Sequence, residues 1–479
     1  MKTVFVASEA APYIKTGGLG DVARDLPAAL AKYVGNEVFV FIPYYKKIKE
    51  NKSFPIEFVT SFSVDLSWRK QHVGIFKLKS RARKLNIYFI DNVYYFGKDG
   101  CYGYYDDGEK FAYFSKAVLE ACLKLSIYPD IIHCNDWQTA LVPIFLRAFY
   151  QDTLGKAKTV FTIHNIEYQG KADGYFLSDT LGLPSSYEDT LSYDGQVNFM
   201  KGAILTTDAL TTVSKTYAEE IKYPYYAHGL APIICEHSFK LCGIVNGIDP
   251  NTCDPMTDKA IVSNYDIKSF KKGKAENKKA LQKELSLEVR DDVPIIGMVS
   301  RIVSHKGADL LCSAIYELMN WDVQIVILGT GDRCYEEVLK NCSDANRGKL
   351  SVNLCFDSAL ASRIYASSDI YLMPSKSEPC GLSQLIAMRY GAIPVVNSTG
   401  GLRDTVEPFD RESQSGVGFT FQSFNKDDML GALRRALEIY GGDRKMWEKA
   451  VANAMSYDSS WDRQTAEYME LYNRITGRA

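Results

Sequence analysis

The sequence has 479 residues, a length that predicts two or three domains rather than a single core. Hydrophobic residues make up 46% and charged residues 24%, and the net charge of −2 gives no support for a charge-driven partner such as a nucleic acid or a membrane surface. The 11 cysteines are odd in number and lack C-x-x-C or zinc-ligand spacing, which favours thiols in a reducing compartment over a disulfide framework.

The first residues are expected to form a strand rather than a signal peptide. The apolar run after Lys2 is short, and Glu9 soon interrupts it. No run of about 18 apolar residues is present, so no membrane span is predicted. We therefore expect a soluble cytoplasmic protein.

Short β-branched segments alternate with helical patterns along the first half of the chain. A helix is predicted at 21–33, and strands are predicted at 3–8, 36–45, 73–79, 85–92, 130–136, 159–165 and 209–214. This alternation indicates an α/β fold with a largely parallel sheet.

The same pattern restarts near residue 293 and becomes more regular. Strands are predicted at 293–300, 323–331, 350–356, 369–375 and 392–401, with helices at 307–320, 335–343, 359–368 and 382–390 between them. Five successive β–α units predict a doubly wound domain. Thr399–Asp404 echoes Thr16–Asp21, and each copy follows a strand, which favours two Rossmann-like domains of related build.

The segment 243–255, rich in Gly, Asn, Asp and Pro, is predicted to join these domains. The expected organisation is an amino-terminal Rossmann-like domain at 1–245 and a carboxyl-terminal one at 246–450. The segment 451–479 is expected to form a terminal helix that crosses back to the first domain.

The glycine-rich segment 13–26, YIKTGGLGDVARDL, lies between a predicted strand and a predicted helix. Gly18-x-Gly20-x-x-Ala23 matches the dinucleotide fingerprint, but Pro43 and Tyr44 stand where a dehydrogenase needs a ribose-binding acid. The backbone N–H groups at the helix start, together with Lys15, could still bind a phosphate. A plain strand-to-helix turn is the alternative interpretation.

Two further groups follow strands of the second half, at the sheet edge where open α/β sheets bind ligands. Arg301 and Lys306 suit a diphosphate, or they are two solvated loop cations. Glu378, just before Gly381 and Leu382, suits a sugar or ribose hydroxyl beside a helix start, or it is an ordinary first-turn acid.

In the first half, polar residues follow two strands that are expected to share a sheet edge. His133, Asn135, Asp136 and Trp137 follow one strand, and His164 with Asn165 follows the next. Such side chains suit a carbohydrate, whose hydroxyl groups need polar partners and whose ring faces need an aromatic group. A histidine at a strand end with only a structural role is the alternative.

Six motifs, in order along nearly the whole chain, together resemble those of bacterial glycogen synthases and plant starch synthases. They are Lys15–Val22, Asn135–Trp137, Thr162–Asn165, Val245–Asp249, Arg301 with Lys306–Gly307, and Pro374–Leu382. The resemblance implies a glycosyltransferase-B fold, with two Rossmann-like domains facing each other across a deep cleft. It also implies transfer of glucose from ADP-glucose to the non-reducing end of an α-1,4-glucan with retention of configuration, and neither a cofactor nor a metal.

The resemblance also implies roles for individual residues, with the acceptor on the first domain and the nucleotide-sugar donor on the second. The implied catalytic residues are His164, Glu378, Arg301 and Lys306. The implied donor-binding residues are Lys15, Gly18, Asn246, Phe356, Cys380, Gly381, Leu382 and Ser383. The implied acceptor-binding residues are Asp21 and Asp136.

The chain departs from the family pattern in two places. Cys253-Asp254-Pro255 replaces a tryptophan-containing segment, and His228 and Ala231 stand where a glycine and an acid are expected. Three functions therefore stay open: ADP-glucose-dependent glucan elongation, a UDP-glucose-dependent transferase or maker of a small glucoside on the same fold, and a non-catalytic glucan-binding paralogue.

Overall fold

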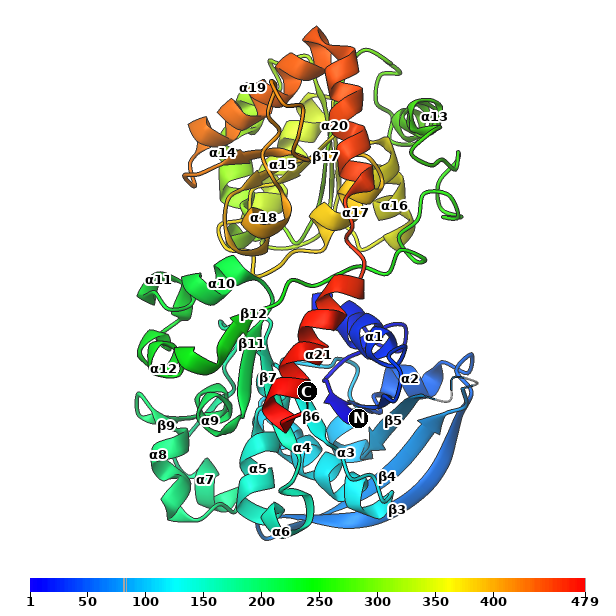
Figure 1. The fold of residues 1–479 in the computed structure, drawn as a ribbon. Helices are drawn as coiled ribbons and strands as arrows, with labels where there is room; N and C mark the ends of the chain where they lie inside the picture. Colours follow the sequence, from blue (N-terminus) through cyan, green and yellow to red (C-terminus); the bar gives the residue numbers. More distant parts are fainter. Residues whose placement is uncertain (81, 83, 479) are drawn as a thin grey trace. The chain divides into compact units, whose positions relative to one another are not determined.

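The computed structural model describes residues 1–80, 82 and 84–478, which form two compact units (Figure 1). The first unit comprises Met1–Asn246 and Trp461–Ala479, and the second comprises Gly247–Ser460. The points where the chain enters and leaves the second unit are joined by a backbone hydrogen bond, from Ile248 N–H to the carbonyl of Ser459 at 2.8 Å.

The first unit is built on a nine-stranded sheet in the order β12-β11-β7-β6-β1-β2-β5-β4-β3. The seven strands from β12 to β5 are parallel, and they are β1 (Lys2–Val6), β2 (Glu37–Pro43), β5 (Leu85–Asp91), β6 (Ile131–Asn135), β7 (Lys158–Ile163), β11 (Ala209–Thr212) and β12 (Leu241–Gly243). The order reverses between β1 and β6, which is the switch point of a doubly wound sheet.

An antiparallel hairpin at the sheet edge was not predicted in full. β3 (Ile56–Leu66) pairs with β4 (Arg69–Leu78), and β4 pairs antiparallel with β5. The sequence predicts a strand at 73–79 but none at 56–66. Most of β3 is exposed or only half-buried, so it lacks the apolar run that marks the central strands.

The helices of the first unit pack on this sheet, and a small sheet of β8 (Lys171–Ala172), β10 (Gln196–Asn198) and β9 (Ser192–Tyr193) lies beside them. The helices are α1 (Gly18–Leu30), α2 (Lys46–Glu50), α3 (Val93–Phe96), α4 (Asp107–Lys124), α5 (Leu141–Phe149), α6 (Gln151–Leu154), α7 (Phe176–Asp179), α8 (Glu188–Leu191), α9 (Phe199–Thr206), α10 (Lys215–Glu220), α11 (Pro224–Ala227), α12 (Ala231–Glu236) and α21 (Asp462–Thr476). The first helix begins at Gly18, three residues earlier than predicted, and Gly17 is its extended N-cap residue.

The second unit is a six-stranded, fully parallel sheet in the order β15-β14-β13-β16-β17-β18, with its switch point between β13 and β16. The strands are β13 (Ile295–Val299), β14 (Gln324–Leu328), β15 (Leu350–Asn353), β16 (Ile370–Met373), β17 (Ile393–Asn397) and β18 (Phe419–Phe421). The helices are α13 (Phe270–Glu284), α14 (Ala308–Leu318), α15 (Arg333–Ala345), α16 (Ser358–Ser367), α17 (Ser383–Arg389), α18 (Gly400–Thr405), α19 (Lys426–Gly442) and α20 (Arg444–Ser456).

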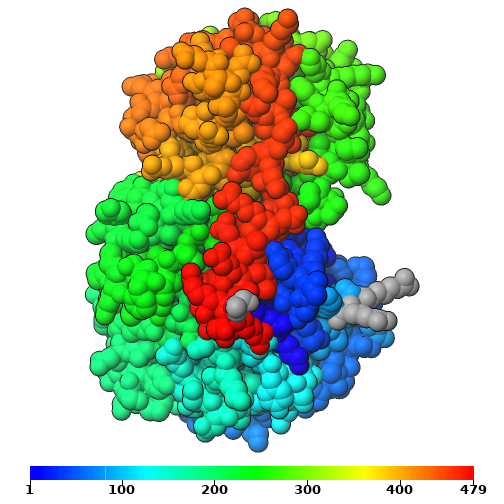
Figure 2. Space-filling model, viewed as in Figure 1, coloured from blue at the N-terminus to red at the C-terminus, as the bar shows by residue number. Residues whose placement is uncertain are grey.

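The segment 451–479 is not one helix. It contains the end of α20, which packs on α17 of the second unit, and all of α21, which packs on α1 of the first. Figure 2 shows α21 in red lying against α1 in blue on the surface of the first unit. The break falls at 457–461, where Asp458 accepts a hydrogen bond from Ser460 N–H in place of helical pairing. Among the described residues, no helix is long and apolar enough to cross a membrane.

Candidate active site

The glycine loop of the first unit closes around a buried carboxylate. Glu9, which is 1% exposed, follows β1. Its Oε1 accepts from the N–H groups of Gly17 at 3.2 Å and Gly20 at 2.9 Å, and its Oε2 accepts from Thr16 N–H at 2.9 Å and from the Thr16 hydroxyl. The sequence predicts that the amides of this loop bind a phosphate, but three of them, those of Thr16, Gly17 and Gly20, already donate to Glu9. An acid at the end of an apolar strand is the only sequence signal that could have indicated this arrangement.

Lys15 and Asp21 form an ion pair on the outside of this loop. Lys15 Nζ lies 2.6 Å from Asp21 Oδ2, and Arg24 lies 3.8 Å from Oδ1 of the same carboxylate. The Lys15 stem crosses Gly20 so closely that a Cβ on Gly20 would lie 3.0 Å from Lys15 Cγ. A side chain at position 20 would therefore make the Lys15 stem or the Glu9 carboxylate shift by a few tenths of an ångström.

The ends of β6 and β7 bring Asn135, Asp136 and His164 together. Asp136 Oδ1 accepts from the N–H groups of His164 at 2.8 Å and Asn165 at 3.3 Å, and His164 Nε2 lies 2.9 Å from Asn135 Oδ1. Asp136 has φ of 56°, a conformation uncommon for a residue with a side chain. The sequence prediction that these two strand ends form one group is therefore confirmed by the contacts within the first unit.

The tautomer of His164 follows from its neighbours. Asn135 Nδ2 donates to the carbonyl of Val6 at 3.0 Å, so the amide must turn its oxygen toward His164. Nε2 of His164 is then the donor, and Nδ1 carries the lone pair. Burial lowers the pKa of His164 to about 3, so the imidazole is neutral at physiological pH.

Two acids of this group have raised pKa values. Burial raises the pKa of Asp136 to about 7, although the amides of His164 and Asn165 act in the opposite direction and the Glu9 carboxyl adds to the rise. Burial also raises the pKa of Glu9, against the hydrogen bonds from the loop amides. Perturbed acids gathered at one switch point are typical of a functional site.

His133 proves to be structural. It is fully buried, its Nδ1 lies 2.6 Å from the Tyr472 hydroxyl of α21, and its Nε2 lies 2.6 Å from Thr162 Oγ1. Burial lowers its pKa to about 3. Trp137 packs against Phe111 and Phe199, so it also supports the site from within the core.

In the second unit, Lys306 and Glu378 form a largely buried ion pair. Lys306 Nζ lies 2.6 Å from Glu378 Oε2, and Ser375 Oγ donates to the same oxygen at 3.0 Å. Gly307 allows this approach, because it has φ of 81° and a Cβ there would lie 2.2 Å from the carbonyl oxygen of Pro374. The two candidate residues, 72 positions apart, thus meet between the ends of β13 and β16.

Arg301 lies on the same edge but is exposed, and its Nη2 lies 3.1 Å from His305 Nε2. Phe356 is 90% exposed in the loop between β15 and α16. Both side chains therefore face solvent, unlike the Lys306–Glu378 pair.

The loop 378–383 is fixed by α17 and α18. Gln384 donates to the carbonyls of Cys380 at 3.1 Å and Gly381 at 2.9 Å, and Gly381 has φ of 75°. Gly401 donates its N–H to the carbonyl of Glu378 at 3.0 Å, and a Cβ on Gly401 would lie 2.2 Å from the carbonyl oxygen of Cys380. The two Thr-Gly-Gly copies are therefore used differently: Thr16 and Gly17 donate to the Glu9 carboxylate, whereas Gly401 donates to the backbone carbonyl of Glu378.

The remaining predicted positions lie at the edges of these groups. Asn246 is buried and is the last residue of the first unit before the chain crosses. His228 is exposed with φ of 47°, and its carbonyl accepts from Gln169 Nε2 at 2.9 Å. A left-handed backbone explains why a glycine is expected there.

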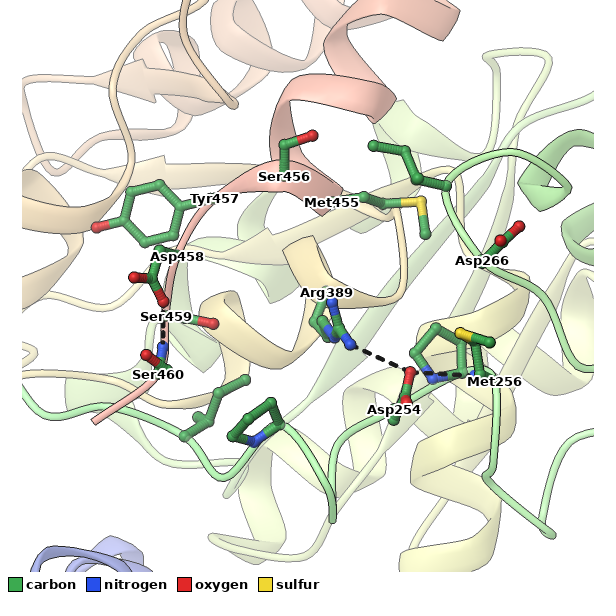
Figure 3. A pocket seen from close by; sticks show the side chains of 14 residues that line it. Asp254, Met256, Asp266, Arg389, Met455, Ser456, Tyr457, Asp458, Ser459 and Ser460 are labelled. Atoms are coloured by element: carbon green, nitrogen blue, oxygen red, sulfur yellow. Dashed lines mark hydrogen bonds and ion pairs between the residues drawn. The ribbon is translucent and has the colours of Figure 1, made fainter. Parts of the chain in front are cut away.

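The second unit also has a cavity of about 530 Å³ that contains none of the predicted site residues. Its lining includes 254–256, 266–267, Arg389 and 455–460. Figure 3 shows Arg389, at the end of α17, reaching toward Asp254, whose Oδ1 lies 3.2 Å from Arg389 Nη2. Asp254 belongs to the Cys253-Asp254-Pro255 segment, which differs from the family pattern. This difference therefore adds an ion pair to the second unit.

Two family models match the chain. Residues 2–236 match the starch synthase catalytic domain, and residues 282–454 match the glycosyl transferases group 1. The chain is 46% identical to a glycogen synthase from Exiguobacterium sibiricum, with 100% of both chains covered. It is also 46% identical to one from Clostridium acetobutylicum, with 99% of this chain and 100% of the relative covered.

A solved structure is similar over its whole length. It is the catalytic domain of starch synthase IV from Arabidopsis thaliana bound to ADP and acarbose, with a TM-score of 0.92, 35% identity and 99% of each chain covered. These matches confirm the predicted relationship to glycogen and starch synthases and the predicted fold of two Rossmann-like α/β domains. The chain belongs to the family of bacterial glycogen synthases and starch synthases, the glucosyltransferases that elongate glucans.

Proposed function

We propose that this glucosyltransferase uses ADP-glucose and extends the non-reducing end of an α-1,4-glucan with retention of configuration. The observation that carries the proposal is the largely buried Lys306–Glu378 pair, which places a cation beside a carboxylate at the switch point of the second unit. The similar starch synthase IV structure was solved with ADP and acarbose, which supports an adenine nucleotide and a glucan-like acceptor.

The donor's leaving group is a diphosphate, so the required catalysis is stabilisation of developing negative charge. We assign this role to Arg301 and Lys306, together with amides of the loop Cys380, Gly381, Leu382 and Ser383. Lys15 and Gly18 contact the diphosphate or glucosyl group from the first unit, and Phe356 stacks on adenine. Asn246 orients the glucosyl group.

Glu378 binds the donor glucose in this scheme. Among the described residues, the two hydrogen bonds to its side chain both engage Oε2, which makes Oε1 the oxygen for a sugar hydroxyl. His164 acts on the glucosyl group as a neutral acceptor, because Nδ1 carries its lone pair and burial holds its pKa at about 3. Asp21 and Asp136 bind the acceptor.

The transfer itself needs no protein nucleophile. The bond from glucose C1 to the phosphate oxygen breaks, and a bond from C1 to the acceptor's 4-oxygen forms on the same face. The acceptor's hydroxyl proton passes to the departing phosphate oxygen. We propose the cytoplasm as the location, consistent with 11 cysteines that lack the spacing of a disulfide framework.

A panel of donors and acceptors tests this function. Purified protein is given ADP-glucose or UDP-glucose with glycogen or maltooligosaccharide, nucleoside diphosphate release is followed, and the new linkage is identified by NMR. We expect rapid ADP release and new α-1,4 linkages. Transfer from UDP-glucose alone would reassign the donor, and release from neither donor would indicate a non-catalytic glucan-binding protein.

A further inference from the structure

The start of α1 in the first unit is an anion site that the chain fills with its own Glu9. The first N–H groups of a helix lack intrahelical partners and attract negative charge, and in dinucleotide-binding folds a phosphate occupies this place. Here the buried Glu9 carboxylate accepts hydrogen bonds from the N–H groups of Thr16, Gly17 and Gly20, all within 3.2 Å. The amide of Gly18, at the exposed tip of the loop, is not one of those that Glu9 takes.

The carboxylate is also held from its other side. The Tyr102 hydroxyl donates to Glu9 Oε2 at 3.3 Å, and that hydroxyl lies 2.7 Å from Ser8 Oγ. Glu9 is therefore fixed by two independent segments. The loop at 15–20 is formed around an immobile acceptor rather than around a ligand.

Glu9 controls Lys15 through Gly20. A Cβ on Gly20 would lie 3.3 Å from Glu9 Oε1 and 3.0 Å from Lys15 Cγ, so the carboxylate and the lysine stem both pack against the space that a side chain at position 20 would fill. The Lys15 ammonium then lies 2.6 Å from Asp21. The place of the Lys15 stem thus depends on the position of Gly20, which the hydrogen bond to Glu9 fixes.

We infer that Glu9 is a positioning residue for donor binding, which orients Lys15 and the Gly18 amide by bonding the other loop amides. The first unit then offers the donor one ammonium group and one exposed backbone amide, not a full phosphate-binding loop. This inference rests on the proposed role of Lys15 and Gly18 in donor binding.

Chemical rescue tests the inference in the full-length protein. Glu9→Ala removes the carboxylate and leaves room for formate, whereas Glu9→Gln fills the same space with an amide. We expect Glu9→Ala to raise KM for ADP-glucose at least tenfold with a smaller change in kcat. Formate should restore most of the loss, relative to chloride at equal ionic strength. Glu9→Gln should stay impaired in formate.

A double-variant comparison separates positioning from general damage. In a Lys15→Ala background, Glu9→Ala should add little to KM, because the lysine it positions is gone. Glu57→Ala, which changes an exposed glutamate of β3, is the matched control for a formate effect. An unchanged KM in Glu9→Ala would overturn the inference. So would a rise in KM that formate does not reverse and that combines multiplicatively with the rise caused by Lys15→Ala.

Hydrogen–deuterium exchange of the peptide at 10–22 gives a reading that does not depend on any donor. We expect slow exchange in the native protein, fast exchange in Glu9→Ala, and slow exchange again in formate. If ADP-glucose turnover is absent but exchange follows this pattern, the donor assignment fails while the role of Glu9 in forming the loop stands. Exchange that Glu9→Ala leaves unchanged overturns the inference even if the donor assignment is correct.

Discussion

At the scale of single residues, the Lys306–Glu378 pair combines a structural and a functional demand. Glu378 is 5% exposed, so its charge depends on the ammonium at 2.6 Å and on the Ser375 hydroxyl. Removing one partner of a buried ion pair leaves the other without compensation, at a cost of about 3–5 kcal/mol. A loss of activity at either position must therefore be separated from a loss of folding.

Lys306→Ala and Glu378→Gln are expected to lower kcat by about 10²–10³-fold, the usual effect of removing one preorganised electrostatic contact. Glu378→Gln should lose less stability than Lys306→Ala, because the amide oxygen can still accept from the Ser375 hydroxyl and from Lys306, whereas Lys306→Ala leaves the carboxylate without its cation. Turnover and differential scanning calorimetry on the same samples check both statements. Lys272→Ala, an exposed lysine of α13, is the control, and near-native turnover in both site variants would refute their roles.

Asp136 predicts a specific pH dependence. Burial raises its pKa to about 7, so it is protonated below and ionised above that pH. An ionised carboxylate accepts a hydrogen bond from a hydroxyl more strongly than the neutral acid does. We expect kcat/KM for the acceptor to rise with pH through about 7 and then level off.

Asp136→Asn should abolish this rise, since the amide oxygen still accepts from His164 N–H and Asn165 N–H but cannot ionise. His164 cannot produce this rise, because its pKa of about 3 means that it does not titrate near pH 7. An identical pH limb in Asp136→Asn would assign it to another group.

At the scale of elements, a buried lysine ties together the ends of the two helices that follow the donor-side loops. Lys274 of α13 donates to the carbonyls of Ala366 and Ser368 at the end of α16, at 3.1 Å and 2.9 Å, and to Tyr390 at the end of α17, at 3.1 Å. Helix ends leave carbonyl groups without intrahelical partners, and the Lys274 amino group supplies donors to them. Residues 356 and 380–382, which precede these helices, are thus anchored from the opposite end.

Lys274→Met is expected to cost about 2–3 kcal/mol, because Ser368 loses this donor and the Tyr265 hydroxyl still bonds Tyr390. Burial lowers the pKa of Lys274 to about 7 from 10.5. Between these values the unfolded chain binds the proton and the folded chain does not, so this group makes stability rise with pH.

Urea unfolding of native protein and Lys274→Met at several pH values above 7 measures the difference. The difference in unfolding free energy between the native protein and Lys274→Met should increase in favour of the native protein as pH rises. A constant gap between the two would show that Lys274 does not titrate there.

At the scale of the whole molecule, the chain's last helix completes the unit that the first strand begins. Trp461, Tyr468, Leu471 and Tyr472 are each less than 5% exposed in the core of the first unit. Burying each such side chain contributes about 1.5–3 kcal/mol, and their sum is comparable to the entire stability of a typical domain.

A chain that ends at Ser460 should therefore lose the unfolding transition of the first unit and keep that of the second. Calorimetry of the truncated protein checks this. Tyr472→Phe is the mild comparison, expected to cost about 1–3 kcal/mol because it removes only the hydroxyl beside His133. A truncated protein with both transitions intact would contradict the account.

The doubly wound pattern of both units could be predicted because each central strand is a continuous apolar run followed by polar residues. β3 could not be, since its side chains are mostly exposed and it is held by pairing with β4. The break between α20 and α21 was also missed, because the helical pattern continues across it. Glu9 was missed because its partners, the amides of its own glycine loop, leave no trace in side-chain pattern.

The sequence by itself determined the family, the parallel α/β architecture and the strand ends that carry Asp136, His164, Arg301 and Glu378. These are local signals, since a strand's burial and the residue that follows it are adjacent in the chain. Only the tertiary structure decided that Lys306 neutralises Glu378 across 72 residues, that Asn135 fixes the tautomer of His164, and that Glu9 occupies the anion site at the start of α1. The physical reason is that hydrogen bonds and ion pairs between separate segments depend on three-dimensional proximity, which periodicity along the chain does not encode.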